Sequence, residues 1–197
     1  MQAKPLLRDI FGFDSFRPGQ EEIVSAVASG SNVLAIMPTG GGKSLCFQLP
    51  ALMRGGITLV VSPLIALMRD QVRSLREVGV EAHALTSGNT AEETESVWQA
   101  LADNTLKLLY IAPERLASQG TLPMLRRAGV SLIAVDEAHC VSQWGHDFRP
   151  DYLRIGELRT ALDVPLAAFT ATADAETQEE IVQKLFGNQR PQVFLRG

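Results

Sequence analysis

Residues 33–44 read VLAIMPTGGGKS and are followed by LCFQLPALM, residues 45–53. A short apolar run, a glycine-rich turn, a Lys-Ser pair and an apolar helical stretch form the strand–loop–helix arrangement that cradles phosphate. Glycine lets the backbone turn tightly enough for successive N–H groups to face one anion, and the helix that follows adds the positive end of its dipole. The stretch therefore predicts a phosphate-binding loop at residues 37–44, here called the P-loop.

Apolar runs of strand length recur along the rest of the chain, with stretches of helical periodicity between them. The runs are residues 33–37, 57–62, 81–85, 107–112, 131–135, 165–169 and 192–196. Most lack polar alternation, which is typical of strands buried on both faces of a parallel sheet. Alternating strands and helices imply right-handed crossovers and helices on both faces. We predict an α/β fold with a mostly parallel β-sheet.

Two helix starts are marked by their residue types. Ser62 and Pro63 have the types preferred at the N-cap and the first position of a helix, which Gly79 would end. Thr90 and Glu93 have the spacing of a capping box ahead of another helix. These residues predict one helix from 62 to about 79 and another beginning at residue 90.

Composition limits the classes of function. With 197 residues, 46% hydrophobic and 20% charged, the chain fits one globular domain, residues 1–197. No apolar run approaches the roughly 18 residues of a membrane span and the N-terminus lacks a signal peptide, so we expect a cytoplasmic protein. The formal net charge of −4 excludes a globally basic nucleic-acid binder. Any contact with nucleic acid must be local.

The two cysteines, Cys46 and Cys140, lie in apolar or motif segments and are not spaced as zinc ligands. We expect reduced structural thiols and no zinc in this chain.

Within the P-loop, Lys43 is expected to reach the β- and γ-phosphates of ATP, and Ser44 to bind Mg²⁺. Met37 departs from the general pattern, which has glycine at this position. A glycine-rich turn with an accidental lysine is the alternative. The candidate nucleotide-binding residues of the loop are Met37, Pro38, Thr39, Gly40, Gly41, Gly42, Lys43 and Ser44.

The run at 131–135 leads into Asp136-Glu137-Ala138-His139, here called the acidic box. Parallel sheets place ligand chemistry at the carboxyl ends of their strands. Asp136 is suited to bind Mg²⁺, and Glu137 to orient and deprotonate an attacking water. The tetrapeptide alone is weak evidence, but with an upstream P-loop it indicates ATP hydrolysis.

The run at 165–169 leads into Thr170 and Thr172. Their hydroxyls can hydrogen-bond the acidic box at a strand end. A plain loop with an N-cap threonine is the alternative.

MPTGGGKS, DEAHC and TATA, in this order, resemble motifs I, II and III of superfamily 2 helicases. Four further stretches resemble the RecQ family: FGFDSFRPGQ (11–20), SPLIALMRDQV (62–72), YIAPERL (110–116) and VSQWGHDFRPDY (141–152). The resemblance covers essentially the whole chain. It implies a RecA-like fold and the first motor lobe of an ATP-dependent 3′-to-5′ DNA helicase that acts in recombination and repair. Helicases often relax the glycine position that Met37 occupies.

The resemblance also implies an adenine site. Gln20 would read the adenine edge, with Arg17 beside it and Phe13 stacked on the ring. A glutamine amide can donate to adenine and accept from it at once. For Phe13, a place in the core is the alternative.

Residues 141–152, here called the aromatic-rich loop, would sense single-stranded DNA. Trp144 and Phe148 would stack on bases, and Arg149 could pair with phosphate. His139 and Gln143 would link the loop to the ATP site. The alternative is that these rings, like Tyr152 and the ring of His146 in the same loop, pack against the domain. Further backbone contacts are implied for Arg69, Arg73 and Arg115; a solvated helix face is the alternative for the first two.

The implied partners are single-stranded or junction DNA and a second RecA-like lobe. The sequence contains no motif of that lobe, of a zinc-binding cluster, of a winged helix or of an accessory module. An arginine finger from a second lobe contributes about 10³-fold or more to phosphoryl transfer. We therefore expect residues 1–197 to bind nucleotide but to hydrolyse it weakly. A DEAD/DEAH-type RNA helicase and a non-catalytic nucleotide switch are the rival hypotheses.

Overall fold

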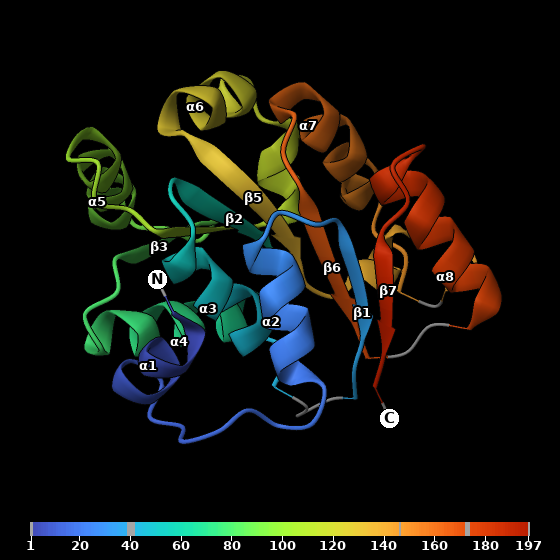
Figure 1. Ribbon diagram of the computed structural model, residues 1–197. Coiled ribbons are helices and arrows are strands. Elements are labelled where there is room, and N and C mark those ends of the chain that lie inside the picture. The colour runs from blue at the N-terminus through green and yellow to red at the C-terminus, as the bar shows by residue number, and fades with distance from the viewer. Residues whose placement is uncertain (1, 39–41, 146, 172–173, 197) are drawn as a thin grey trace.

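The computed structural model describes residues 2–38, 42–145, 147–171 and 174–196. Within them, seven strands form one sheet in the order β3-β4-β2-β5-β6-β1-β7, and every neighbouring pair is parallel (Figure 1). The strands are β1 (Val33–Ile36), β2 (Ile57–Val61), β3 (Ala82–Leu85), β4 (Leu108–Ile111), β5 (Val130–Val135), β6 (Leu166–Thr170) and β7 (Gln192–Leu195). Each predicted apolar run overlaps one of these strands, which confirms the α/β prediction.

Helices cover both faces of the sheet. One face carries α1 (Ala3–Asp9), α2 (Gln20–Ala28), α3 (Leu45–Met53) and α4 (Ile65–Glu77). The other carries α5 (Ala91–Ala102), α6 (Thr121–Ala128), α7 (Arg154–Leu162) and α8 (Ala175–Ile181). Short turns of helix connect them: η1 (Pro113–Ala117), η2 (Ala138–Val141), η3 (Pro150–Leu153) and the π-helical η4 (Val182–Phe186). The side chains of β2, β4 and β6 are buried throughout, since helices pack on both sides.

One of the two predicted helix starts is confirmed. The Thr90 hydroxyl accepts from the Glu93 N–H at 3.1 Å and the Glu93 carboxylate accepts from the Thr90 N–H at 2.8 Å, which completes the capping box of α5. The start predicted at Ser62 and Pro63 is wrong, because α4 begins at Ile65. The Ser62 hydroxyl accepts from the Leu64 N–H at 3.4 Å, and this local turn delays the helix.

Gly79 ends the α4 segment as predicted. Its φ of +87° lies in the left-handed region that favours glycine, and its N–H donates to the Arg76 carbonyl. Cys46 and Cys140 are free and buried, as expected for structural thiols. Among the described helices, none is long and apolar enough to cross a membrane.

The carboxyl ends of all seven strands meet at one edge, at the bottom of Figure 1. Strand β6 lies between β1 and β5. The P-loop follows β1, the acidic box follows β5 and Thr170 ends β6. The sheet order therefore places the threonine between the two predicted halves of the site.

Candidate nucleotide-binding site

The P-loop connects β1 to the N-terminus of α3. Met37 is buried, and its N–H donates to the Thr170 carbonyl at 2.9 Å. Pro38, Gly42, Lys43 and Ser44 are described, whereas the predicted residues Thr39, Gly40 and Gly41 lie outside the described residues. Gly42 has a φ of +82°, and a Cβ there would collide with the Gln20 amide. This position therefore requires glycine.

Ser44 stands at the N-cap of α3, where its carbonyl accepts from the N–H groups of Phe47 and Gln48. Its side chain is half-buried and hydrogen-bonds to none of the described residues. The hydroxyl is thus available beside Lys43, at the positive end of the helix dipole.

The Lys43 ammonium lies between the two carboxylates of the acidic box. Its Nζ is 3.7 Å from Asp136 Oδ1 and 3.7 Å from Glu137 Oε1. Burial raises the pKa of Asp136 above its ordinary value, while the Lys43 charge lowers it. The structure thus brings together the three residues that the sequence predicts to be catalytic.

Glu137 adopts an unusual backbone conformation. Its φ of +54° lies in the left-handed region, which costs a non-glycine residue about 1 kcal/mol or more. The Glu137 N–H donates to Asp136 Oδ1 at 3.0 Å. The Glu137 side chain lies between two basic side chains. Its Oε1 faces the Lys43 ammonium, and its Oε2 lies 3.5 Å from His139 Nε2. The strained turn therefore places one carboxylate between an ammonium and an imidazole.

His139 connects the acidic box to the end of β6. Its Nδ1 lies 2.9 Å from the hydroxyl of Thr170, which is fully buried. The sequence predicts a hydrogen bond between this threonine and the acidic box, and the structure contains one. Thr172, predicted for the same role, lies outside the described residues.

Tyr152 hydrogen-bonds to the backbone of the acidic box. It is fully buried, and its hydroxyl donates to the Asp136 carbonyl at 2.8 Å. Sequence reasoning grouped this residue with the aromatic-rich loop and missed its contact with Asp136. An aromatic residue two positions after a proline gives no signal of such a partner.

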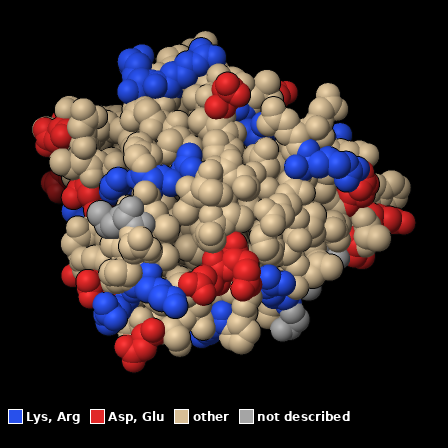
Figure 2. All heavy atoms as spheres, in the orientation of Figure 1, with Lys and Arg blue, Asp and Glu red and all other residues tan. Residues whose placement is uncertain are grey.

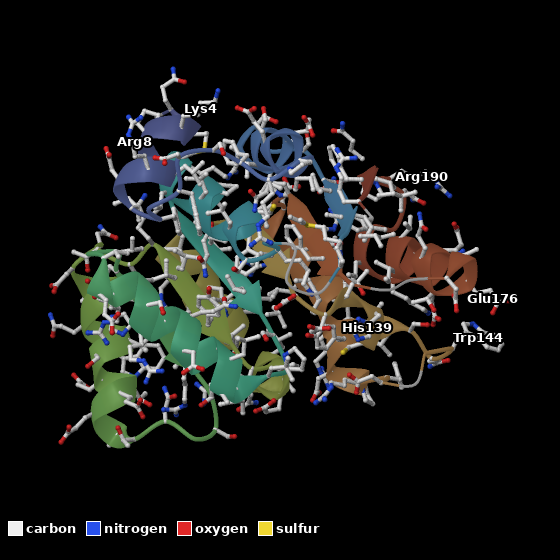
Figure 3. All side chains as sticks on the ribbon, turned by 90° about the horizontal axis from the view of Figure 1, so that it is seen from below. Lys4, Arg8, His139, Trp144, Glu176 and Arg190 are labelled. Atoms are coloured by element: carbon white, nitrogen blue, oxygen red, sulfur yellow. The ribbon has the colours of Figure 1, made fainter. Side chains whose placement is uncertain are left out.

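The aromatic-rich loop separates into buried and exposed parts. Trp144 is 76% exposed, Phe148 is half-buried and Tyr152 is buried. Packing against the domain is therefore correct for Tyr152 and wrong for Trp144. Figure 3 places Trp144 at the edge of the molecule, close to Glu176, whereas His139 lies closer to the centre. His146 lies outside the described residues.

One side chain and one backbone N–H of this loop bind Glu180 of α8. The Ser142 hydroxyl donates to Glu180 Oε1 at 2.7 Å and the Gln143 N–H donates to Oε2 at 3.1 Å. The Gln143 side chain itself is exposed. Sequence reasoning missed Glu180, because nothing near it in the chain marks it as different from the acidic residues around it.

His139, Cys140 and Asp147 place potential metal-ligand atoms within 4.8 Å of one another. The Cys140 thiol lies 3.7 Å from Asp147 Oδ2 as a hydrogen-bond donor, and burial raises its pKa to about 12. Arg149 lies 3.5 Å from the other carboxylate oxygen of Asp147. A protonated thiol is a poor metal ligand. We interpret this cluster as a hydrogen-bonded network at the base of the loop.

Of the predicted adenine residues, Gln20 contacts the P-loop directly. Gln20 is 3% exposed; its Oε1 accepts from the Arg17 N–H at 2.9 Å and its Nε2 donates to the Gly42 carbonyl at 3.2 Å. An amide has two N–H groups and two lone pairs, so one of each remains for a ligand. Phe13 is 53% exposed, so the alternative that it belongs to the core is wrong. Arg17 is also exposed.

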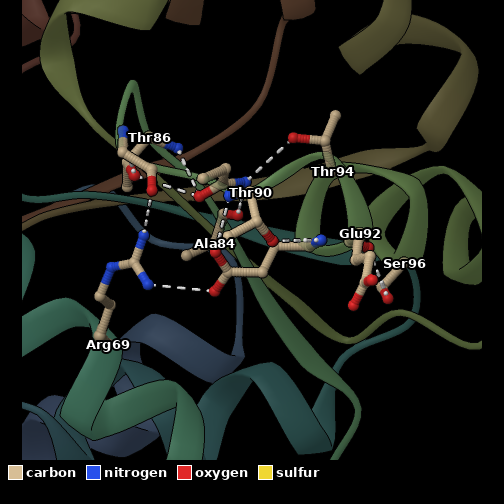
Figure 4. A network of polar contacts seen from close by, with 10 residues as sticks. Arg69, Ala84, Thr86, Thr90, Glu92, Thr94 and Ser96 are labelled. Carbon is tan, nitrogen blue, oxygen red and sulfur yellow. Dashed lines mark hydrogen bonds and ion pairs between the residues drawn. The ribbon is translucent and has the colours of Figure 1, made fainter.

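The arginines predicted to contact a DNA backbone are distributed over the surface. Arg69 pairs with Glu93 at 3.0 Å and donates to the Gly88 carbonyl at 3.0 Å (Figure 4), and Arg73 pairs with Asp70. Arg115 is half-buried and lines a groove of about 610 Å³ between α5 and α6. On the face in Figure 2, basic and acidic side chains alternate in small groups. This distribution of charge agrees with local contacts between the chain and a nucleic acid, as the net charge predicts.

Comparison with known sequences identifies related proteins. The family profile described as DEAD/DEAH box helicase matches residues 17–181. The chain is 48% identical over 184 residues to the protein named ATP-dependent DNA helicase RecQ of Haemophilus influenzae, covering 93% of this chain and 30% of that protein. It is 50% identical over 186 residues to the RecQ protein of Synechocystis, covering 91% and 39%. The chain thus spans about a third of the length of these relatives.

Comparison with known structures identifies the same fold. The helicase domain of Pyrococcus furiosus Hef aligns over 96% of this chain and 39% of its own, with a TM-score of 0.72 and 24% identity. Helicase Lhr of Mycobacterium smegmatis, in complex with single-stranded DNA and AMP-PNP, aligns over 98% of this chain and 27% of its own, with a TM-score of 0.71 and 25% identity. Both similarities confirm the RecA-like lobe.

Proposed function

Because the chain belongs to the DEAD/DEAH box helicase family, in its RecQ branch, we propose that it is the ATP-binding motor lobe of an ATP-dependent DNA helicase. The observation that carries the proposal is the position of Lys43. Its ammonium lies between Asp136 and Glu137, at the edge of the sheet where the P-loop and the N-terminus of α3 meet. This arrangement provides one cation and a helix N-terminus for a triphosphate, with two carboxylates beside them.

Nucleotide binding begins with the phosphates. The P-loop amides and the dipole of α3 attract them, and Lys43 moves its charge from the carboxylates to the β- and γ-phosphates. The Ser44 hydroxyl and the Asp136 carboxylate are hard oxygen ligands of the kind that Mg²⁺ prefers, so these residues fit the ion. When bound, Mg²⁺ would neutralise charge on the phosphates. Gln20 offers its remaining donor and acceptor to adenine, with Arg17 hydrogen-bonded beside it. Phe13 is exposed and would stack on the ring.

Hydrolysis requires a base at the acidic box. Glu137 extends from its left-handed turn and accepts a proton from the attacking water. His139 contacts both Glu137 and Thr170, so it transmits changes at the acidic box to the end of β6. The second RecA-like lobe supplies the arginine finger, without which we expect this lobe to turn over ATP weakly.

DNA is proposed as the polymer partner. The similarity to Lhr, whose structure contains single-stranded DNA, supports this choice, as do the RecQ relatives. Trp144, Phe148 and Arg149 would contact the strand, and Arg69, Arg73 and Arg115 would add local backbone contacts. Unwinding in the 3′-to-5′ direction during recombination and repair, in the cytoplasm, belongs to the whole protein and is part of the proposal.

Calorimetry with ATP and Mg²⁺ tests the nucleotide site. We expect saturable binding, weakened about tenfold to a hundredfold in Lys43→Ala, because a charge-assisted contact contributes about 1.5–3 kcal/mol. Lys4→Ala removes the same charge from the exposed surface of α1 and serves as the control. Equal affinities in Lys43→Ala and Lys4→Ala would contradict the proposal. Titration of deoxyribose and ribose oligomers then distinguishes a DNA partner from an RNA partner.

A further inference from the structure

A buried carboxylate on α8 has no role in the site described so far. Glu180 is 9% exposed, and buried carboxylates are rare unless they are paired or hydrogen-bonded. Its two oxygens accept from the Ser142 hydroxyl at 2.7 Å and from the Gln143 N–H at 3.1 Å. Burial raises the pKa of Glu180, but these hydrogen bonds outweigh it and bring the pKa below its ordinary value. The group is therefore a carboxylate at neutral pH.

The two hydrogen bonds fix three successive residues of the aromatic-rich loop. Ser142 is fully buried, and its hydroxyl, which donates to Glu180, also accepts from the Trp144 N–H at 3.2 Å. The carboxylate thus holds Ser142 and Gln143 directly and Trp144 through the serine. The indole of Trp144 is 76% exposed on this fixed backbone. The ring is therefore accessible to a planar ligand such as a nucleotide base.

The same segment is attached to the ATP site at its other end. It begins at Glu137, continues through η2 and ends at Trp144. His139 binds Thr170 at the end of β6, and Glu180 binds Ser142 and Gln143 from α8, the next helix after β6. Residues 137–144 are therefore held at two points, by the end of β6 and by α8. The proposed base Glu137 and the exposed ring of Trp144 lie at the two ends of this anchored segment.

The side chains around Trp144 favour contact with a nucleotide base over contact with a phosphate group. The ring borders a shallow depression on α8 that is lined by Glu176, Glu179 and Glu180 (Figure 3). These carboxylates repel a phosphate on that side, whereas a nucleotide base can stack on the indole face. The orientation of the indole ring therefore determines whether a base of the strand can stack on it.

We propose that Glu180 is the positioning residue for Trp144: its carboxylate holds residues 142–144 so that the indole is presented to a single DNA strand. This inference rests on the proposed function. Glu180 would act through the Ser142 hydroxyl and the Gln143 backbone, and not by contact with nucleotide or DNA.

Tryptophan fluorescence tests the proposal, since the chain contains only Trp98 and Trp144. In a Trp98→Phe background, the emission reports Trp144 alone. The measurements are its anisotropy, its response to oligo-deoxythymidine and the amide exchange rate of Gln143. Glu180→Ala and Glu180→Gln are compared with Glu179→Ala, which removes the same charge from the adjacent position of α8. ATP affinity in each variant reports whether the site remains intact.

Glu180→Ala is expected to lower the anisotropy of Trp144, to speed Gln143 exchange about tenfold and to raise the half-saturating oligonucleotide concentration about tenfold, with unchanged ATP affinity. Glu180→Gln should recover most of each loss, because the amide can accept from Gln143 and donate to Ser142. Glu179→Ala should leave the Trp144 anisotropy and the Gln143 exchange rate as in the parent, because, in the part of the chain that the structure describes, Glu179 makes no hydrogen bond to Ser142 or Gln143. Equal effects of Glu179→Ala and Glu180→Ala would mean that charge near the ring, and not positioning, is responsible, and would overturn the proposal.

If Glu180→Ala does not fold, Ser142→Ala removes the other half of the contact and must lower the Trp144 anisotropy; an unchanged value overturns the proposal. DNA binding and the positioning role of Glu180 are tested by different measurements. A parent chain that does not respond to the oligonucleotide contradicts DNA binding. Unchanged Gln143 exchange in Glu180→Ala contradicts the positioning role.

Discussion

Replacing Tyr152 with phenylalanine tests how the acidic box is held. The peptide between Asp136 and Glu137 is bound at both ends: its carbonyl accepts from the Tyr152 hydroxyl at 2.8 Å, and its N–H donates to Asp136 Oδ1 at 3.0 Å. Tyr152→Phe keeps the buried ring and removes one hydroxyl, so it leaves no large cavity. It does leave a carbonyl without its partner.

The expected loss of stability follows from that carbonyl. An unsatisfied buried acceptor costs about 1–3 kcal/mol, and we expect about 1.5 kcal/mol here. With a urea m-value of about 2 kcal/mol/M, the unfolding midpoint should fall by about 0.7 M without a change in slope. Burial raises the pKa of Tyr152 well above its ordinary value. The hydroxyl therefore stays a neutral donor, and the loss should be the same at pH 6 and pH 9.

Turnover should fall as well. Without the tyrosine, the peptide can rotate about its remaining hydrogen bond, and Glu137 leaves the left-handed turn that directs its carboxylate. We expect about a tenfold lower kcat in the two-lobe protein with ATP affinity nearly unchanged, because Lys43 and the P-loop are not altered.

Thr90→Ala is the matched control. It breaks the capping box of α5, which should cost about 1 kcal/mol, but it lies at the far edge of the sheet beside β3. Its turnover should equal that of the parent. The reasoning is refuted if the Tyr152→Phe midpoint does not move, or if the two variants lose equal turnover.

Three further outcomes are expected. Glu137→Gln should bind ATP with parent affinity in calorimetry and lower kcat about 10²-fold or more in the two-lobe protein, since the base is lost; retained turnover would assign the base elsewhere. Gly156→Ala should lower the urea midpoint strongly, because a Cβ there would overlap the Lys184 carbonyl oxygen, and an unchanged midpoint would contradict this packing. Burial raises the pKa of both Cys46 and Cys140 to about 12, so at pH 8 neither should react with a thiol reagent until urea unfolds the chain.

The strands and the two halves of the ATP site could be predicted because their signals are local. A strand buried on both faces is apolar throughout, as in residues 57–61, and a parallel sheet brings the carboxyl ends of its strands to one edge. The start of α4 could not be predicted from its cap residues. A serine hydroxyl can cap a helix or close a local turn, and here it accepts from the Leu64 N–H in a turn before the helix.

The supports of the site could not be predicted, because each joins residues that only the tertiary fold brings together. Glu180 binds a serine 38 positions earlier, and Tyr152 binds a carbonyl 16 positions earlier. Residue type marks neither contact, since the Tyr152 partner is a backbone carbonyl and Glu180 binds a backbone N–H as well as the serine hydroxyl. The aromatic-rich loop shows the same limit: composition groups Trp144 with Tyr152, and only packing separates an exposed ring from a buried one.

Asp136 and Glu137, the two residues of the acidic box assigned to catalysis, both have features that destabilise the folded chain at neutral pH. Burial raises the pKa of Asp136, so the folded chain holds that proton more tightly than the unfolded chain does. Its contribution to stability is therefore greatest below the pKa of the unfolded chain and is lost as pH rises through the raised value. Glu137 adds the cost of a left-handed backbone. Neither feature stabilises the folded chain at neutral pH, but a desolvated carboxylate attracts a cation strongly. A cation that binds at Asp136 would therefore offset the cost of burying this carboxylate.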